Sequence, residues 1–81
     1  MNTKFIDIKR SKDELILKVG LLIKTRRNEI GISQEMLGEM SGIGRDYISK
    51  LENGRKPGFT FGLIAKVFDA LSMDWGEIDK L

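Results

Sequence analysis

The sequence predicts one small all-α domain built of five helices. Apolar residues recur at the three- and four-residue spacing of amphipathic helices, and glycines and capping residues separate these segments. The 81 residues, of which 41% are hydrophobic, are enough for one modest core. The formal net charge of +2 is too small for the strongly charged composition of an intrinsically disordered chain.

The first predicted helix runs from about Asp13 to about Asn28. Gly31 then ends it, in the position where a glycine closes many helices. The apolar residues that recur at helical spacing along this segment, and that we expect to face the core, are Leu15, Val19, Leu22, Ile23 and Ile30.

Two short helices follow, joined by a tight turn. Ser33 is a suitable cap for a second helix that runs through Met40. Residues 41–44, Ser-Gly-Ile-Gly, form the predicted turn. The third helix then runs from about Arg45 to Asn53, where an Asn-Gly pair predicts its end.

A fourth helix is predicted from a cap at Thr60 to about Leu71, and a short fifth helix from a cap at Asp74. Glu77, three residues after Asp74, completes a pattern similar to a capping box. The apolar stripe of the fourth helix consists of Leu63, Ile64, Val67, Phe68 and Leu71.

Four of the five predicted helices begin with the same apolar pattern. In a hydrophobic staple, the residue before the N-cap packs against the residue four positions after the cap. The pairs at these positions are Ile32 with Leu37, Ile43 with Ile48, Phe59 with Ile64, and Met73 with Ile78. Randomly placed boundaries would rarely meet this condition four times, so the pattern supports the helix count.

The first twelve residues have a weaker pattern. Residues 4–9 alternate imperfectly and are compatible with a short strand, a frayed helical turn or an extended arm. Lys9, Arg10 and Lys12 suit an arm on a polyanion, and a solvated tail is an equally good interpretation. We therefore divide the chain into an N-terminal arm or extension, residues 1–12, and a domain, residues 13–81.

The sequence contains neither cysteine nor histidine. This composition excludes disulfides, metal sites built of thiolate or imidazole, and catalysis by a cysteine or histidine. We therefore expect no enzymatic activity, no metal and no cofactor. No apolar run approaches the ~20 residues of a membrane span and no signal peptide opens the chain, so we expect a cytoplasmic protein.

Charge is unevenly distributed along the chain. Residues 18–58 hold eight basic and five acidic residues, whereas residues 59–81 hold two basic and four acidic ones. A basic middle is compatible with a surface that faces an anion, although a solvated face is the more common explanation for such a run.

The second and third predicted helices, with their glycine turn, form a helix-turn-helix, the unit whose second helix enters the major groove of DNA. Gly42 can adopt a positive φ in the turn without steric cost. Gly38 is small where the second helix has to approach the third. Leu37, Ile48 and Leu51 supply the apolar contact between the two helices.

One side of the third helix is predicted to face the bases. If Ile48 and Leu51 point inward, the rotation of ~100° per residue directs the polar residues outward. The predicted base contacts are Arg45, Asp46, Ser49 and Lys50. Arginine and lysine reach guanine O6 and N7, and an aspartate accepts from cytosine N4. The alternatives are ordinary surface charge and, for Asp46, stabilisation of the first helical turn.

A second group is predicted to contact the sugar-phosphate backbone: Gln34, Tyr47, Asn53, Arg55 and Lys56. Gln34 stands at the N-terminus of the second helix, where backbone amides attract phosphate. Tyr47 is also suited to covering the edge of the core. Lys24 and Arg26 are expected to be solvated instead.

Residues 31–37, Gly-Ile-Ser-Gln-Glu-Met-Leu, and 48–54, Ile-Ser-Lys-Leu-Glu-Asn-Gly, resemble the Cro/C1-type (XRE) family of bacterial and phage helix-turn-helix regulators. The resemblance extends from about Leu15 through Ile78. It implies a compact five-helix, lambda-repressor-like domain that binds operator DNA, usually as a dimer.

The resemblance also implies roles for single residues. Gln34 corresponds to the family's glutamine at the start of the second helix, and the family's base contacts fall on the four positions given above. Arg27 and Glu52 match a buried ion pair that joins the first and third helices in many members. Two glycines depart from the family pattern, because Gly38 stands where alanine is usual and Gly44 where a serine or threonine cap is usual. The loop that holds Pro57 is about one residue longer than is typical.

Together these features predict a DNA-binding transcriptional regulator, a repressor, that binds double-stranded operator DNA with inverted repeats as a homodimer. Trp75, Ile78 and Leu81 are candidates for the dimer interface as well as for the core. An antitoxin with a toxin partner, or a restriction-modification controller, has the same size and motif. A module that uses these helices to bind a protein is the alternative from a different class.

Overall fold

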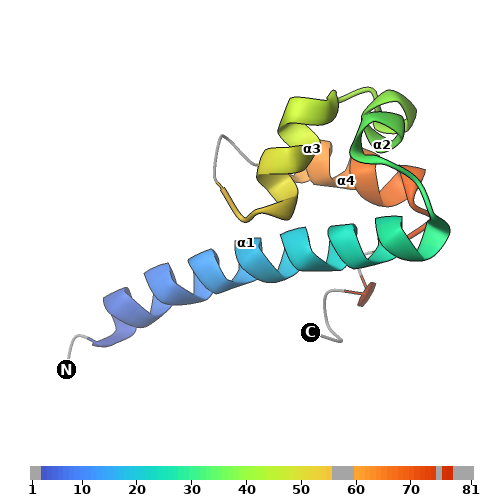
Figure 1. Ribbon diagram of the computed structural model, residues 1–81. Coiled ribbons are helices and arrows are strands. Elements are labelled where there is room, and N and C mark those ends of the chain that lie inside the picture. The colour runs from blue at the N-terminus through green and yellow to red at the C-terminus, as the bar shows by residue number, and fades with distance from the viewer. Residues whose placement is uncertain (1–2, 56–59, 75, 78–81) are drawn as a thin grey trace.

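The structure is a computed structural model that describes residues 3–55, 60–74, 76 and 77. In these ranges the chain forms helices and turns and no strand, which confirms the predicted all-α class. The helices are α1 (Thr3–Ile30), α2 (Gln34–Ser41), α3 (Arg45–Glu52) and α4 (Phe61–Ala70) (Figure 1).

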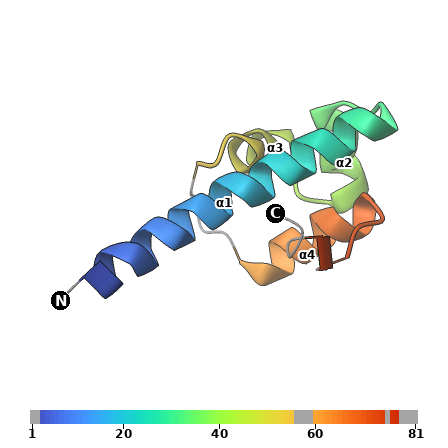
Figure 2. The same cartoon turned by 90° about the horizontal axis from the view of Figure 1, so that it is seen from below.

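The three shorter helices gather on one side of α1, over its C-terminal half (Figure 1). The N-terminal half of α1 runs beyond them in both views (Figures 1 and 2). A helix of 28 residues is about 42 Å long, which accounts for a molecule of 47 × 24 × 19 Å. The molecule is therefore a small helical body with one long helix that extends past it.

The predicted start of the first helix is wrong, because α1 begins at Thr3 rather than near Asp13. The short strand considered for residues 4–9 is likewise wrong, since these residues are helical. Neither glycine nor proline occurs between Thr3 and Val19, so nothing in the backbone stops a helix once it has begun. An anion-binding role for this segment stays a prediction.

Side-chain caps begin α2 and α4 at the predicted places. The Ser33 hydroxyl accepts a hydrogen bond from the Met36 amide at 3.0 Å, and the Thr60 hydroxyl accepts one from the Leu63 amide at 3.2 Å. The starts of α2 and α4 therefore follow from local chemistry that the sequence already contains.

The predicted fifth helix is present only as a single turn in the described part of the chain. Asp74 accepts a hydrogen bond from the Gly76 amide at 2.8 Å, and residues 76 and 77 form a 3₁₀ turn. The structure thus has four α-helices over its described residues, and the five-helix count is not confirmed. The proposed dimer residues Trp75, Ile78 and Leu81 lie outside the described residues.

One apolar cluster holds the helices together. Its fully buried members are Ile23, Leu37, Ile48, Leu51, Val67, Phe68 and Leu71. Leu15 and Ile30, which were predicted to face this core, are instead 46% and 44% exposed. Both lie away from the part of α1, around Val19 and Ile23, that the other helices cover.

The backbones of α1 and α3 approach closely at Gly20, which is buried. A Cβ atom at this position would meet the carbonyl oxygen of Leu51 and lie 3.1 Å from the carbonyl oxygen of Glu52. Backbone atoms cannot rotate away as a side chain can, so only glycine fits this crossing. The position of α3 on α1 therefore depends on Gly20.

All four helices end with the same pair of backbone hydrogen bonds, the Schellman motif. In α4 the Met73 amide donates to the Phe68 carbonyl at 2.8 Å, and the Ser72 amide donates to the Asp69 carbonyl at 3.1 Å. The motif requires one residue of positive φ, and the residues in that position are Gly31, Gly42, Gly54 and Ser72. Ser72, at φ 55°, is the one non-glycine residue among them.

We expect Ser72→Gly to stabilise the protein by about 1 kcal/mol, because glycine adopts the left-handed conformation without the steric cost of a Cβ atom. For a domain of this size the melting temperature should rise by about 4–8 °C. Thermal denaturation followed by circular dichroism measures the change. Ser72→Ala is the matched control, since it keeps the Cβ atom and should bring no gain. Equal melting temperatures for Ser72→Gly and the parent would contradict the prediction.

Candidate nucleic-acid interface

The turn between α2 and α3 is set by two glycines of positive φ. Gly42, at φ 73°, follows α2, and its amide donates to the Glu39 carbonyl at 3.3 Å. Gly44, at φ 100°, directly precedes Arg45 and forms no side-chain cap. A serine or threonine would be strained at this φ, so the departure from the usual cap residue has a conformational reason.

Gly38 lies buried where α2 approaches the beginning of α3. A Cβ atom here would stand 2.8 Å from the amide nitrogen of Arg45 and 2.8 Å from the carbonyl carbon of Gly44. The structure therefore agrees with the expectation that a small residue is needed at this position. The close approach fixes where the first residue of α3 lies relative to α2.

Helix α3 has an apolar and a polar side. Ile48 and Leu51 are fully buried, whereas Arg45, Asp46 and Lys50 are exposed. Ser49, the fourth predicted base contact, is half-buried. The structure thus brings three of the four predicted residues to the surface of one short helix.

A shallow hollow of about 510 Å³ lies beside the exposed side of α3. Its lining comes from the turn and the first part of the helix: Ile43, Gly44, Arg45, Asp46, Tyr47 and Lys50. Tyr47 is half-buried, and burial raises the pKa of its hydroxyl, which therefore stays protonated at neutral pH. The hollow combines two cations, one carboxylate and one phenol hydroxyl at the surface.

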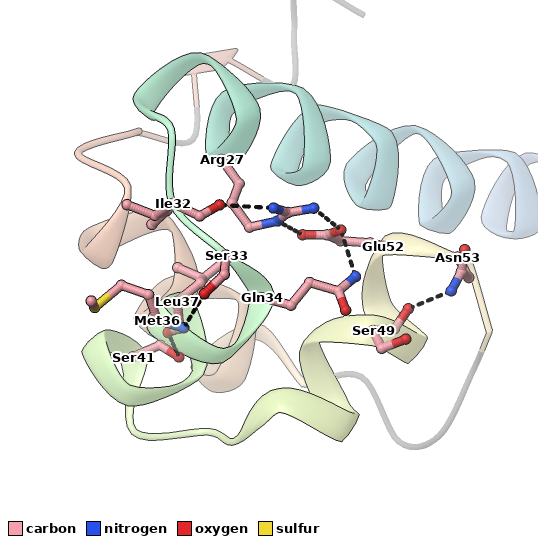
Figure 3. Close-up of polar contacts among 10 residues, drawn as sticks. All are labelled: Arg27, Ile32, Ser33, Gln34, Met36, Leu37, Ser41, Ser49, Glu52 and Asn53. Carbon is pink, nitrogen blue, oxygen red and sulfur yellow. Dashed lines mark hydrogen bonds and ion pairs between the residues drawn. The ribbon is translucent and has the colours of Figure 1, made fainter.

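Arg27 and Glu52, the pair suggested by the family resemblance, form an ion pair between α1 and α3 (Figure 3). The guanidinium donates from Nε to Oε2 at 2.7 Å and from Nη2 to Oε1 at 3.0 Å. A third bond from Nη1 reaches the Ile32 carbonyl at 2.8 Å. The Glu52 side chain is 1% exposed and that of Arg27 is 11% exposed.

The hydrogen bonds to Glu52 raise the pKa of Arg27 above its ordinary value, and the opposite charge of Glu52 adds to this effect against the cost of burial. Arg27 is therefore held in its charged form beside Glu52. The pair is a fixed part of the scaffold that supports α3.

Gln34 belongs to the same network, which the sequence did not reveal. Its Nε2 donates to Glu52 Oε1 at 3.0 Å, so the start of α2 is tied to the end of α3 (Figure 3). A second hollow, of about 530 Å³, opens beside it and is lined by Arg27, Ser33, Gln34, Glu35 and Arg45. The half-buried Gln34 is thus both a support for Glu52 and part of the lining of a surface hollow.

The remaining predicted backbone contacts follow the end of α3. Asn53 is exposed, and its Nδ2 donates to the Ser49 carbonyl at 2.8 Å. Arg55 is exposed, and its amide donates to the Lys50 carbonyl at 3.0 Å. Lys56 lies outside the described residues. Arg55 is therefore the one cation of this group that the structure places at the surface.

Arg26 was expected to be solvated, and its side chain is 40% exposed but also forms a contact that was not expected. Its Nε donates to the Leu71 carbonyl at 3.2 Å, so the side chain joins α1 to the end of α4 and is half-buried. The partners are 45 residues apart in the sequence, and no local pattern indicates such a contact. Lys24, by contrast, is exposed as expected.

Searches for similar proteins gave one result. A family model described as helix-turn-helix (HTH_3) matches residues 23–76, which is more than half of the chain. No curated protein and no solved structure matches. The matched residues begin within α1 and include α2, α3 and α4.

Two kinds of feature are missing from the part of the chain that the structure describes. It holds no helix with the length and apolar character needed to cross a membrane. The same residues contain no group of three or more acidic side chains arranged to bind a metal ion.

Proposed function

The chain belongs to the Cro/C1-type (XRE) helix-turn-helix family, and we propose that it is a sequence-specific transcriptional regulator that reads operator DNA with α3. The division of α3 into two sides carries this proposal. Ile48 and Leu51 anchor the helix in the core, whereas Arg45, Asp46 and Lys50 on the polar side are exposed in the described part of the chain. The major groove is wide enough to admit such a helix.

Arg45 and Lys50 are the residues we propose for direct base contacts. Both side chains are exposed and can donate to O6 and N7 of guanine. Asp46 either accepts from cytosine N4 or orients Arg45, its neighbour on the first turn of α3. Half-buried Ser49 lets the helix approach the bases closely because its side chain is small.

The N-terminus of α2 and the end of α3 are proposed to bind phosphates on either side of the groove. The backbone amides of Gln34 and Glu35 lie in the first turn of α2, where the hydrogen bonds of the helix itself do not use them. Such amides favour the binding of an anion. The protonated Tyr47 hydroxyl, Asn53 and Arg55 are suited to donate to further phosphates. These contacts position the protein without selecting a sequence.

We further propose a repressor that binds as a homodimer and acts by occupying its operator. A two-fold symmetric protein matches an inverted repeat whose half-sites lie about one helical turn apart, roughly 34 Å. From the sequence we still expect a cytoplasmic protein of bacterial or phage origin.

Two arginine variants should both bind DNA more weakly but differ in their effect on sequence preference. Arg45→Ala should lower affinity for the preferred site by about 1–3 kcal/mol and relax the preference at one base position. Arg55→Ala should weaken binding to all sequences alike and reduce the salt slope by about 1. Titration of preferred and scrambled duplexes at several salt concentrations measures both effects.

Lys66→Ala is the matched control for these variants, because Lys66 is an exposed cation on α4. It should leave both specificity and salt slope close to those of the parent. Parental binding by both arginine variants would contradict the proposed contacts.

Selection of bound duplexes from a random pool tests the function itself. The proposal predicts a palindromic consensus, recovered at moderate salt. A pool without enrichment, together with tight binding of a protein partner by the same helices, would instead support a protein-interaction module.

A further inference from the structure

One face of α1 carries two large apolar side chains that stay more than half exposed, although Leu17 also packs against Gly54 at the end of α3. Leu17 is 55% exposed and Leu21 is 62% exposed. Seen from below, α1 lies in front of α2 and α3 (Figure 2). Exposed leucines four residues apart on a helix form a continuous apolar surface.

Charged residues flank this pair of leucines in a symmetric pattern. Glu14, Leu17, Leu21 and Lys24 follow one another at intervals of three, four and three residues, the spacing of a coiled-coil seam. All four side chains are exposed. Val19 and Ile23, which mark the inward side of α1, are buried. The four residues therefore form one exposed stripe along the helix, with Leu17 at the edge that meets Gly54, and we call it the outer stripe.

We propose that the outer stripe is the contact surface for a second copy of this chain, with the two α1 helices antiparallel. Antiparallel pairing centred at the level of residue 19 places Leu17 opposite Leu21 of the other copy. It also places Glu14 opposite Lys24 of the other copy at both ends. Parallel pairing would instead set glutamate against glutamate and lysine against lysine, which is unfavourable.

The length of α1 suits this pairing. With the centre at residue 19, the two copies of α1 overlap over residues 8–30, about 34 Å, and a strip ~10 Å wide gives an interface on the order of 700 Å² over both copies. Interfaces of this size are small, so a reversible dimer is expected in the absence of DNA. Of the outer stripe, only Lys24 lies within residues 23–76, the range that the family model matches. The surface is thus a feature of this chain beyond the matched domain.

Sedimentation equilibrium of the full chain without DNA, up to about 1 mM, tests the proposal. The parent should dimerise, and Leu21→Glu should weaken the dimer by at least about 10-fold, because the buried pair of leucines would acquire two charges. Met40→Glu is the matched control. Met40 is 51% exposed on α2, so the same kind of substitution there should leave the dimer unchanged. Circular dichroism of each variant checks that α1 and the fold are retained.

Charge reversal tests the antiparallel register. Glu14→Lys and Lys24→Glu should each weaken the dimer by about 3–10-fold, since each creates two like-charged pairs. The double variant should dimerise as the parent does. An equimolar mixture of the two single variants should form a heterodimer, because both opposite-charge pairs are restored across it.

Three results would overturn the proposal: a parent that stays monomeric over this concentration range, a Leu21→Glu variant that dimerises as the parent does, or a double charge-reversal variant that stays weakened. The measurements contain no DNA, so each of these outcomes leaves the proposed reading of DNA by α3 untouched. Loss of DNA binding alone would likewise leave the proposed dimer surface in place.

Discussion

Glu52→Ala is expected to destabilise the protein by about 3–5 kcal/mol. The substitution would leave the Arg27 guanidinium, which is 11% exposed, without its carboxylate between α1 and α3. It would also remove the acceptor of the Gln34 amide (Figure 3). A domain of 81 residues has a total stability of about 4–12 kcal/mol, so the variant would lose a large part of it.

Chemical denaturation of parent and variants measures this loss. Glu39→Ala is the matched control, because Glu39 is an exposed glutamate on α2 and its removal should change stability by less than about 0.5 kcal/mol. Replacing both partners, Arg27→Met with Glu52→Leu, should cost less than Glu52→Ala alone, since no unpaired charge stays buried. If Glu52→Ala behaved as the control does, the ion pair would not hold α1 to α3.

Gly20→Ala is expected to lower the free energy of unfolding by about 1–3 kcal/mol, although alanine is the better helix former by about 1 kcal/mol. The added methyl group would meet the carbonyl oxygens of Leu51 and Glu52, so α1 and α3 would have to move apart. That movement would also lengthen the ion pair beside it, and the two effects would add.

Gly62→Ala is the control for this substitution. In α4 a Cβ atom at Gly62 would meet only the Thr60 hydroxyl oxygen, at 3.8 Å, which is ordinary contact. The control should therefore be neutral or stabilising by up to about 1 kcal/mol. A Gly20→Ala variant as stable as Gly62→Ala would mean that the two backbones do not approach as described.

The sequence predicted the short helices well because their boundaries depend on local chemistry. Ser33 and Thr60 act as caps through hydrogen bonds to amides three residues ahead, and such patterns are visible in the sequence itself. The inner stripe of α4 was also predicted, since Ile64, Val67 and Phe68 are buried at the expected spacing. Each of these features involves residues close together in the chain.

The first helix was predicted less well, because its N-terminal half runs beyond the other helices, where no core imposes a periodicity (Figures 1 and 2). Leu15 and Ile30 fit the helical spacing of core residues, yet the body covers only part of α1. Helical spacing indicates a face of a helix but cannot show how much of that face another helix covers. The extension of α1 to Thr3 was missed for the same reason.

The polar side of α3 was anticipated from the spacing of Ile48 and Leu51, and the ion pair of Arg27 with Glu52 from the family resemblance. The sequence did not predict the hydrogen bonds from Gln34 to Glu52 and from Arg26 to the Leu71 carbonyl. Their partners are far apart in the sequence, and only the packing of the helices brings them together.

The most direct test of the central claim, that the polar side of α3 reads bases, is a comparison of the consensus sequences selected from a random duplex pool by the parent and by Lys50→Gln. Lysine favours guanine and glutamine favours adenine through their major-groove edges. We predict that the preferred base changes at one position in each half-site while the rest of the consensus is kept. An identical consensus for both proteins would contradict the assignment of Lys50, and with it the placement of this side of α3 in the groove.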